Sequence, residues 1–378
     1  MNLRYRHIDI QIEAHPKFNI CSLEIEEALK ELESDFAAFA ELPVSQGGSD
    51  TAWNILISIG KNSVSSKTSR PRFAFSFRDA RAFNWGRNRR VQYADGSGIQ
   101  INDGLRTADI WASNPVRLRE LSYLYIHHRL GLSLDELGFH RVHALGICDA
   151  ASGDCALIIM NAGAGKTTRA LSLAQFAPAR YLFYSDEMPL ISGRKIYPLP
   201  IRVSTCPETL AALDTFSHPT YRVFKRTLYQ PKYLIPLLEL GAIAKPSLVT
   251  AVLIGSRSPD GTASIGPASR LRCFVELFKS MVLGLGMIQI VELTVRLDFG
   301  RVFSLARSVV GRITEALVMS VRTPVFEFRL GTDWEKNVRL LNEFWMLETF
   351  PNKTSLHSPG IKTVLHTPHS EASEHLLP

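Results

Sequence analysis

The sequence predicts an α/β fold preceded by a smaller α+β region. One observation is an apolar run at 155–160 that leads through a glycine-rich turn into a helical pattern ending before Pro178. Another is that apolar runs of strand length alternate with helical patterns further along the chain, at 181–184, 249–254 and 334–346. Before residue 110, by contrast, strand patterns surround a single amphipathic helix.

Composition is typical of a globular chain with more than one domain. The 378 residues suffice for two domains, and 46% apolar residues can fill both cores. The net charge of +7 favours an acidic partner or substrate without requiring nucleic acid. Five cysteines without a C-x-x-C pair favour a reduced, cytoplasmic chain. The start lacks a signal-peptide pattern, and the most apolar stretch, 281–293, is too short to cross a bilayer, so we expect no membrane span.

The first elements follow from local patterns. Apolar residues at helical spacing predict an amphipathic helix over 22–39. Strands are expected where β-rich or alternating runs occur, at 53–59, 73–77, 91–93 and 99–101. A further helix over about 115–130 has Asn114 as N-cap, proline in its first turn and Gly131 just past its end.

The second half is predicted to open with a hairpin. Runs at 142–148 and 155–160 are joined by the polar turn 149–154, and the helix after the glycine loop extends to Phe176. A Ser-, Thr-, Pro- and His-rich composition after residue 350 predicts a disordered tail. We therefore expect an accessory α+β domain over 1–135, a core over 136–348 and a tail over 349–378.

The glycine-rich turn is close to the phosphate-binding pattern G-x-x-x-x-G-K-[ST], with Met160 at the first glycine. Glycines let backbone N–H groups turn toward a polyphosphate, the lysine supplies a cation, and the Thr167 hydroxyl can ligate Mg²⁺. The alternative is a strand–turn–helix that uses glycine and lysine for structure alone. The predicted nucleotide-binding residues are Asn161, Ala162, Gly163, Ala164, Gly165, Lys166, Thr167 and Thr168.

Two adjacent carboxylates, Asp186 and Glu187, follow the strand at 181–184, about twenty residues after Lys166. We expect that strand to lie beside the strand that precedes the glycine loop. One carboxylate could accept a proton while the other holds Mg²⁺ directly or through water. The alternative is a strand-end turn with two solvated acids.

The motif order resembles that of the HPr kinase/phosphorylase-like proteins, P-loop kinases whose fold is similar to ATP-dependent phosphoenolpyruvate carboxykinase. The resemblance covers roughly 140–340, includes relatives found with peptide-modification gene clusters, and is carried by Val142-His143-Ala144, the glycine loop, Ser185-Asp186-Glu187, Tyr197-Pro198-Leu199-Pro200 and Phe326 to Gly331.

The resemblance implies a role for each matching position. Lys166 would contact the transferred phosphate, Asp186 would act as the base, and His143 would lie near the phosphate. Thr167 and Glu187 would hold Mg²⁺. For His143, a structural role as a core histidine is the alternative.

The family's glycine-rich second signature, which carries a catalytic arginine and a metal-binding glutamate, is not found in this chain. Its absence argues against HPr as the substrate. Arg202, and after it Arg222 and Lys225, are candidates for the missing charge-neutralising cation.

A basic stretch lies between residues 61 and 90, with five aromatic residues interleaved and Asp79 as its one acid. Such a stretch could bind single-stranded nucleic acid or an acidic peptide. We favour the solvated face of an edge strand, whose charges discourage aggregation. The cations are Lys61, Lys67, Arg70, Arg72, Arg78, Arg81, Arg87, Arg89 and Arg90.

Together these patterns predict a Mg·ATP-dependent kinase that transfers the γ-phosphoryl group to a hydroxyl, foremost Ser or Thr of a peptide or protein. A small-molecule alcohol is a second acceptor class. The rival hypotheses are a nucleotide-binding scaffold or pseudokinase in a peptide-modification pathway, and a nucleic-acid-stimulated ATPase. The sequence leaves open whether the chain forms a homo-oligomer.

Overall fold

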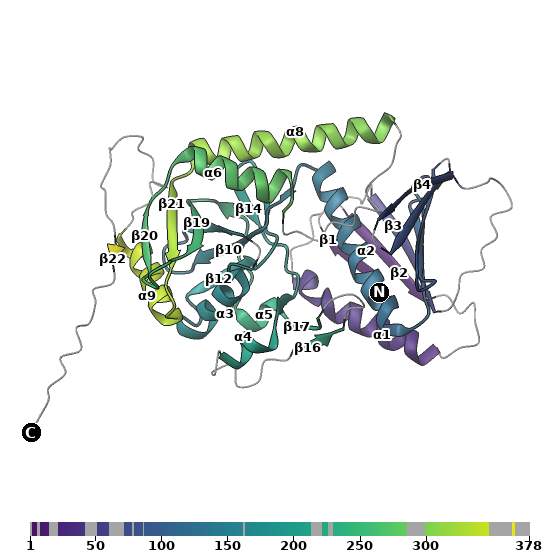
Figure 1. Cartoon of the computed structure of the whole chain (residues 1–378), viewed down its shortest axis with the longest axis horizontal. Coiled ribbons are helices and arrows are strands. Elements are labelled where there is room, and N and C mark those ends of the chain that lie inside the picture. The colour runs from purple at the N-terminus through teal and green to yellow at the C-terminus, as the bar shows by residue number, and fades with distance from the viewer. Residues whose placement is uncertain are drawn as a thin grey trace, which may run out of the picture.

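The structure is a computed structural model, and it confirms a mixed α/β fold with several sheets (Figure 1). None of its described helices combines the length and the apolar character that a membrane crossing needs. The described residues are 2–5, 8–14, 22–41, 51–59, 72–77, 79–85, 87–161, 163–212, 221–225, 230–285, 299–347 and 365–366.

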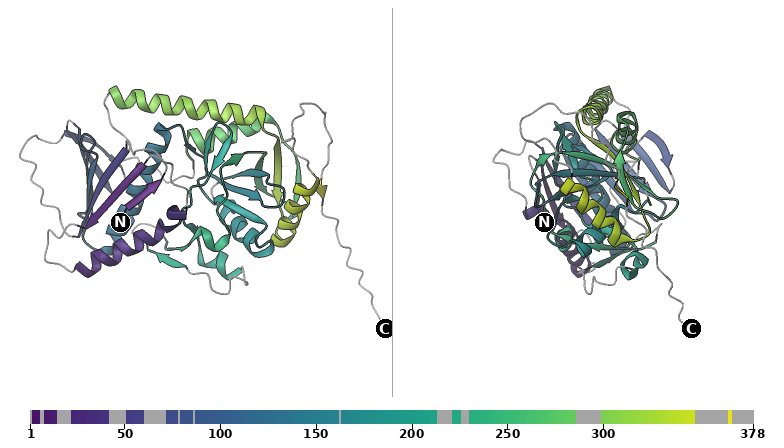
Figure 2. Two further views of the ribbon diagram at one scale, coloured as in Figure 1. Left: turned by 180° about the vertical axis from the view of Figure 1, so that it is seen from behind. Right: turned by 90° about the vertical axis from the view of Figure 1, so that its left-hand side faces the viewer.

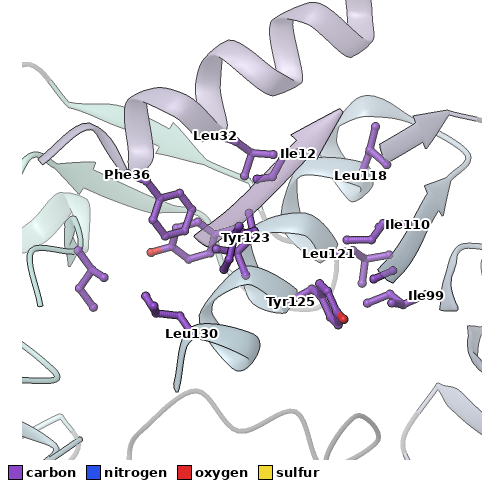
Figure 3. Packing of buried hydrophobic residues seen from close by; sticks show 14 of the residues in the cluster. Ile12, Leu32, Phe36, Ile99, Ile110, Leu118, Leu121, Tyr123, Tyr125 and Leu130 are labelled. Carbon is purple, nitrogen blue, oxygen red and sulfur yellow. The ribbon is translucent and has the colours of Figure 1, made fainter. Parts of the chain in front are cut away.

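The N-terminal part is a sheet of order β1-β2-β3-β8-β7-β6-β5-β4. Helices α1 (Ser22–Asp35) and α2 (Pro115–Glu136) pack on it, with Leu32, Leu121 and Ile110 in one buried cluster (Figure 3). A 3₁₀ turn, η1, follows α1 at Ala37–Glu41. The strands are β1 (Asn2–Tyr5), β2 (Ile8–Ala14), β3 (Thr51–Ile59), β4 (Arg72–Phe77), β5 (Ala80–Trp85), β6 (Asn88–Tyr93), β7 (Gly98–Asn102) and β8 (Thr107–Ala112).

The second part is built on a sheet of order β12-β10-β11-β19-β21-β20-β22, which helices cover on both faces (Figures 1 and 2). Alternate residues of β10 and β11 enter two different hydrophobic clusters, one with α3 and α9 and one with α6 and α8. The strands are β10 (Ala144–Asp149), β11 (Cys155–Met160), β12 (Tyr181–Ser185), β19 (Ala251–Arg257), β20 (Ser264–Pro267), β21 (Val325–Leu330) and β22 (Leu365–His366). The helices are α3 (Lys166–Phe176), α5 (Leu237–Leu240), α6 (Arg270–Leu277), the π-helical turn η2 (Phe278–Val282), α8 (Phe299–Arg322) and α9 (Trp334–Leu347).

Two small sheets complete the second part. One has the order β18-β14-β13-β9, formed by β9 (His140–Arg141), β13 (Leu190–Ser192), β14 (Lys195–Tyr197) and β18 (Ser247–Leu248). The other has the order β15-β17-β16, formed by β15 (Val203–Thr205), β16 (Arg222–Phe224) and β17 (Lys232–Ile235), with helix α4 (Pro207–Ala212) after β15.

The two parts are in contact. The N-terminal hydrophobic cluster continues into Leu190, Leu199 and Phe224 of the second part. Asp135, near the end of α2, lies 3.2 Å from the His140 imidazole and is paired with Arg312 of α8. Helix α8 spans both parts along one side of the molecule (Figure 1). The domain boundary after residue 135 stays a prediction, because side chains from both sides of it share one core.

Most local predictions are confirmed, including the hairpin β10–β11 and helices α3 and α9. The predicted end of the helix at Gly131 is wrong, because α2 continues to Glu136. This glycine provides space instead, since a Cβ there would collide with the Arg141 guanidinium. Of the predicted tail, Leu365–His366 pairs with β20 and the other residues after 347 lie outside the described residues.

The edge-strand interpretation of the basic stretch agrees with the topology for β4, the outermost strand of its sheet, but it is wrong for Arg89 of the inner strand β6, which is buried and paired with Asp103. The phenylalanine side chains of β4 and the residues Lys61, Lys67, Arg70 and Arg78 lie outside what the structure describes. Charged residues on an edge strand discourage pairing with other chains. Nucleic-acid or peptide binding by this stretch stays untested.

Candidate functional site

The glycine loop joins the end of β11 to the start of α3. Gly163 has φ +76° and Gly165, the N-cap of α3, has φ +105°. A Cβ at Gly163 would meet nothing within 4 Å, so conformation rather than space requires glycine there. Of the predicted loop residues, only Ala162 lies outside the described set. Both glycines therefore have the left-handed backbone conformation that a tight glycine-rich turn requires, and the Ala164 N–H donates to the carbonyl oxygen of Asn161 inside the loop.

Met160, at the first glycine of the pattern, is the last residue of β11 and points into the core. It is 3% exposed and pairs in register with Gly255 of the parallel strand β19. A Cβ on Gly255 would lie 2.5 Å from the Met160 Cγ, so the thioether occupies space that this glycine leaves free. Methionine at the first glycine position is thus accommodated inside the sheet, and its side chain packs in the core rather than in the glycine loop.

This packing predicts that Gly255→Ala destabilises the protein. Overpacking of this kind costs about 1–3 kcal/mol, and the added methyl would press on a buried side chain in the middle of the sheet. Chemical denaturation measures the loss in free energy of unfolding. Gly266→Ala is the control, because a Cβ there meets nothing within 4 Å. Equal stability of the two variants would contradict the packing described for Met160.

Lys166 opens α3 and is 7% exposed. Its Nζ donates a hydrogen bond of 2.7 Å to the carbonyl oxygen of Met160. Burial lowers the pKa of Lys166 to about 8, although Glu187 and Asp186 act in the opposite direction. The ammonium is therefore mostly charged at neutral pH and lies at the base of the loop.

Asp186 reaches the loop by a route that differs from the predicted one. Strand β12 pairs with β10, so it does not lie beside β11 as expected. Because β10 is antiparallel to both neighbours, β11 and β12 run in the same direction and end at the same edge of the sheet. The Thr167 hydroxyl consequently donates a 3.1 Å hydrogen bond to Oδ2 of Asp186. Oδ1 of Asp186 is buried and has no hydrogen-bond partner.

The pKa values of the two carboxyl groups are shifted because Asp186 is buried and Glu187 lies half-buried beside it. Burial, and then the Glu187 charge, raises the pKa of Asp186 to about 7. Burial also raises the pKa of Glu187, while Lys232 and Lys166 oppose the change. A carboxylate with a pKa near 7 can both accept and release a proton at physiological pH.

His143 lies just before β10 and is 6% exposed. Neither of its ring nitrogens has a hydrogen-bond partner. Burial and the charge of Lys166 lower its pKa to about 4, so the imidazole is neutral at pH 7. A core histidine normally has its polar atoms satisfied, so its place on the cavity wall favours a role toward a ligand.

These residues line one cavity of about 480 Å³. It also contains two cations that the sequence analysis did not single out, Lys232 from β17 and Arg257 from the end of β19. The Arg257 guanidinium donates to the carbonyl oxygen of Gly163 at 3.2 Å. The lining consists of His143, Gly163, Gly165, Lys166, Thr167, Thr168, Asp186, Glu187, Ser204, Thr205, Cys206, Thr209, Lys232 and Arg257.

The predicted charge-neutralising residue Arg202 is not part of this lining, and that expectation is corrected. Its Nε lies 3.0 Å from Oδ1 of Asp35 in α1. Arg222 is likewise paired with Asp35, and Lys225 does not line the cavity. Carboxylates of the N-terminal part hold both arginines, so among the described residues Lys232 and Arg257 are the cations that line the cavity besides Lys166.

The oxygen atoms at the loop fit a hard divalent cation. Mg²⁺ prefers hydroxyl, carboxylate and water oxygens. Thr167, Asp186 and Glu187 line the same cavity, and Oδ1 of Asp186 is buried without a hydrogen-bond partner. A buried carboxylate oxygen without a donor is costly unless a cation or a proton compensates it. The donor set therefore suits Mg²⁺ together with phosphate oxygens.

No protein-family model matches the chain, and a search of curated proteins finds no match.

Chemical modification of Cys206 can test whether a nucleotide binds in this cavity. It is exposed on the cavity lining, whereas Cys148, Cys155 and Cys273 are buried. We expect iodoacetamide to alkylate Cys206 and Mg·ATP to slow that reaction at least several-fold, measured by peptide mapping. Cys206→Ser identifies the modified peptide. Labelling that is unaffected by saturating Mg·ATP would contradict nucleotide binding at this lining.

Proposed function

We propose that the protein binds Mg·ATP in this cavity and transfers the γ-phosphoryl group to a hydroxyl. The observation that carries the proposal is the hydrogen bond from Thr167 to Asp186 beside the buried Lys166, at the opening of a helix after a glycine loop. Anions favour helix N-termini, and phosphoryl transfer needs cations, a metal and a positioned base. All of these requirements have candidate residues around one cavity.

The chemistry of each side chain in the cavity suits it to a different role in phosphoryl transfer. Lys166, Lys232 and Arg257 would neutralise phosphate charge, and Thr167 and Glu187 would hold Mg²⁺. When bound, the metal would supply charge neutralisation on the phosphate oxygens. Asp186 would accept the proton of the acceptor hydroxyl, for which a pKa of about 7 is suitable. Neutral His143 would donate or accept a hydrogen bond near the transferred group.

The motif order supports a core similar to the HPr kinase/phosphorylase-like proteins, and with it Ser or Thr of a peptide or protein as the foremost acceptor. This family assignment is part of the proposal. The inward packing of Met160 removes one reason to favour a scaffold without activity, because the loop path does not depend on a glycine there. Oligomeric state and a cytoplasmic location stay predictions.

The test is transfer of radiolabel from [γ-³²P]ATP into separate acceptor pools. The pools are Ser/Thr peptides, small alcohols and a control of single-stranded DNA that would raise only ATP hydrolysis. We expect label in the peptide pool with wild-type protein and about 10²–10⁴-fold slower labelling with Asp186→Asn. Label in the alcohol pool alone would redirect the acceptor class. ATP binding without transfer to any pool would favour the scaffold.

A further inference from the structure

One wall of the cavity belongs to a small three-stranded sheet, whose position depends on contacts with other elements. Strands β15, β17 and β16 contain three or four residues each, and strands this short give little independent stability. Ser204 and Thr205 of β15 and Lys232 of β17 nevertheless line the cavity. Their position must therefore be fixed by contacts outside this sheet.

Those contacts come from the N-terminal part. Asp35, the last residue of α1, has a fully buried side chain. It is paired with Arg202, which directly precedes β15, and with Arg222, the first residue of β16. Both flanking strands of the small sheet are thereby tied to a single carboxylate.

Arg202 also binds the helix backbone. One of its Nη atoms donates to the carbonyl oxygen of Ser34 at 2.8 Å, and the other lies 3.5 Å from the carbonyl oxygen of Leu234 in β17. Cations are favourable at the C-terminal end of a helix, where backbone carbonyls lack partners. The Arg202 side chain thus bridges the end of α1 to the strand that carries Lys232.

Two residues of helix α2 add further contacts to the small sheet. Arg119 pairs with Glu31 of α1 and lies 4.9 Å from the ring centre of Phe224 in β16. Tyr123 packs against the same ring at 5.4 Å. The sheet is therefore held by both N-terminal helices, with Asp35 as the fully buried acid among three arginines.

We propose that Asp35 is a positioning residue, which acts through Arg202 and Arg222 to hold the small sheet so that Lys232 faces the phosphates in the cavity. The inference rests on the proposed nucleotide site and gives the N-terminal part a role in that site. Removing one partner of a buried ion pair leaves the other charge uncompensated. Without Asp35 the two arginines repel each other, and β15 and β16 lose their common anchor.

The test is a double-mutant cycle on Mg·ATP affinity. Asp35→Asn and Lys232→Met are each expected to weaken binding about tenfold. The double variant is expected to bind no more weakly than Lys232→Met, because Asp35 acts through that lysine. Asp35→Glu, which keeps the charge, is expected to recover much of the loss. Full affinity of a folded Asp35→Asn, or losses that multiply in the double variant, would overturn the proposal.

Two further measurements separate the positioning role of Asp35 from protein folding and from the proposed function. Arg202→Met, which removes the cation paired with Asp35, replaces Asp35→Asn in the cycle if the latter does not fold, with the same expectation. Alkylation of Cys206, which follows β15, is expected to accelerate in Asp35→Asn without any nucleotide. If wild-type protein binds no ATP, faster alkylation still supports positioning of the wall while the proposed function fails. An unchanged rate in that case overturns the positioning role too.

Discussion

Lys166→Ala is expected to lose at least tenfold and up to about a hundredfold in Mg·ATP affinity, since hydrogen bonds to charged groups contribute about 1.5–3 kcal/mol. The lysine is the most enclosed cation of the cavity and lies at the base of the loop. The measurement is the ATP-induced rise in melting temperature, which we expect to be clearly smaller in this variant at the same ATP concentration.

Lys195→Ala is the matched control, because Lys195 is an exposed lysine on β14 outside the cavity lining. It should keep the full ATP-induced rise. The variant Lys166→Ala should also keep its fold, which near-ultraviolet circular dichroism can check. An undiminished rise in folded Lys166→Ala would contradict the placement of phosphates at the loop.

Asp186→Asn is expected to lower phosphoryl transfer by about 10²–10⁴-fold, the usual contribution of a positioned acid or base. The amide keeps the shape and can still accept from Thr167, so ATP binding should survive. It cannot take up a proton or balance a cation. Stimulation of ATP binding by Mg²⁺, measured against EDTA, should therefore fall with the transfer rate.

The pH dependence gives a second readout of the same residue. Because the pKa of Asp186 is about 7 in the folded protein against 3.8 ordinarily, the protonated form is the stabilised one. In ligand-free protein its contribution to stability is present below pH 4 and is lost as the pH rises through 7. Mg·ATP affinity should rise over the upper part of that window, because an ionised Asp186 beside Glu187 adds negative charge that attracts the cation. Both dependences should vanish in Asp186→Asn, and their persistence would assign them to another group.

Patterns of residues close in sequence were sufficient to predict the glycine loop and the strands and helix next to it. The apolar runs at 142–148 and 155–160, the turn at 149–154 and Pro178 were enough to predict the hairpin and α3, because each signal depends on residues close in sequence. The acid pair was found for the same reason, since it ends a short buried strand. Its contact with Thr167 required only that β11 and β12 end at one edge, although β10 lies between them.

The remaining features depend on contacts between distant segments. Arg202 was selected as a free cation, but Asp35, far away in the sequence, neutralises it. Lys232 carries no local signal and reaches the cavity only through the small sheet. Gly131 has the pattern of a helix end, yet it makes room for Arg141. Pairing partners of this kind leave no local pattern, because they lie far apart in the sequence.

Calorimetric titration of the wild-type protein with Mg·ATP tests the central claim most directly. We expect one nucleotide to bind per chain with micromolar affinity, with binding weakened when EDTA replaces Mg²⁺. No heat of binding from protein that circular dichroism shows to be folded would mean that the loop serves only the fold, and the kinase proposal would fall.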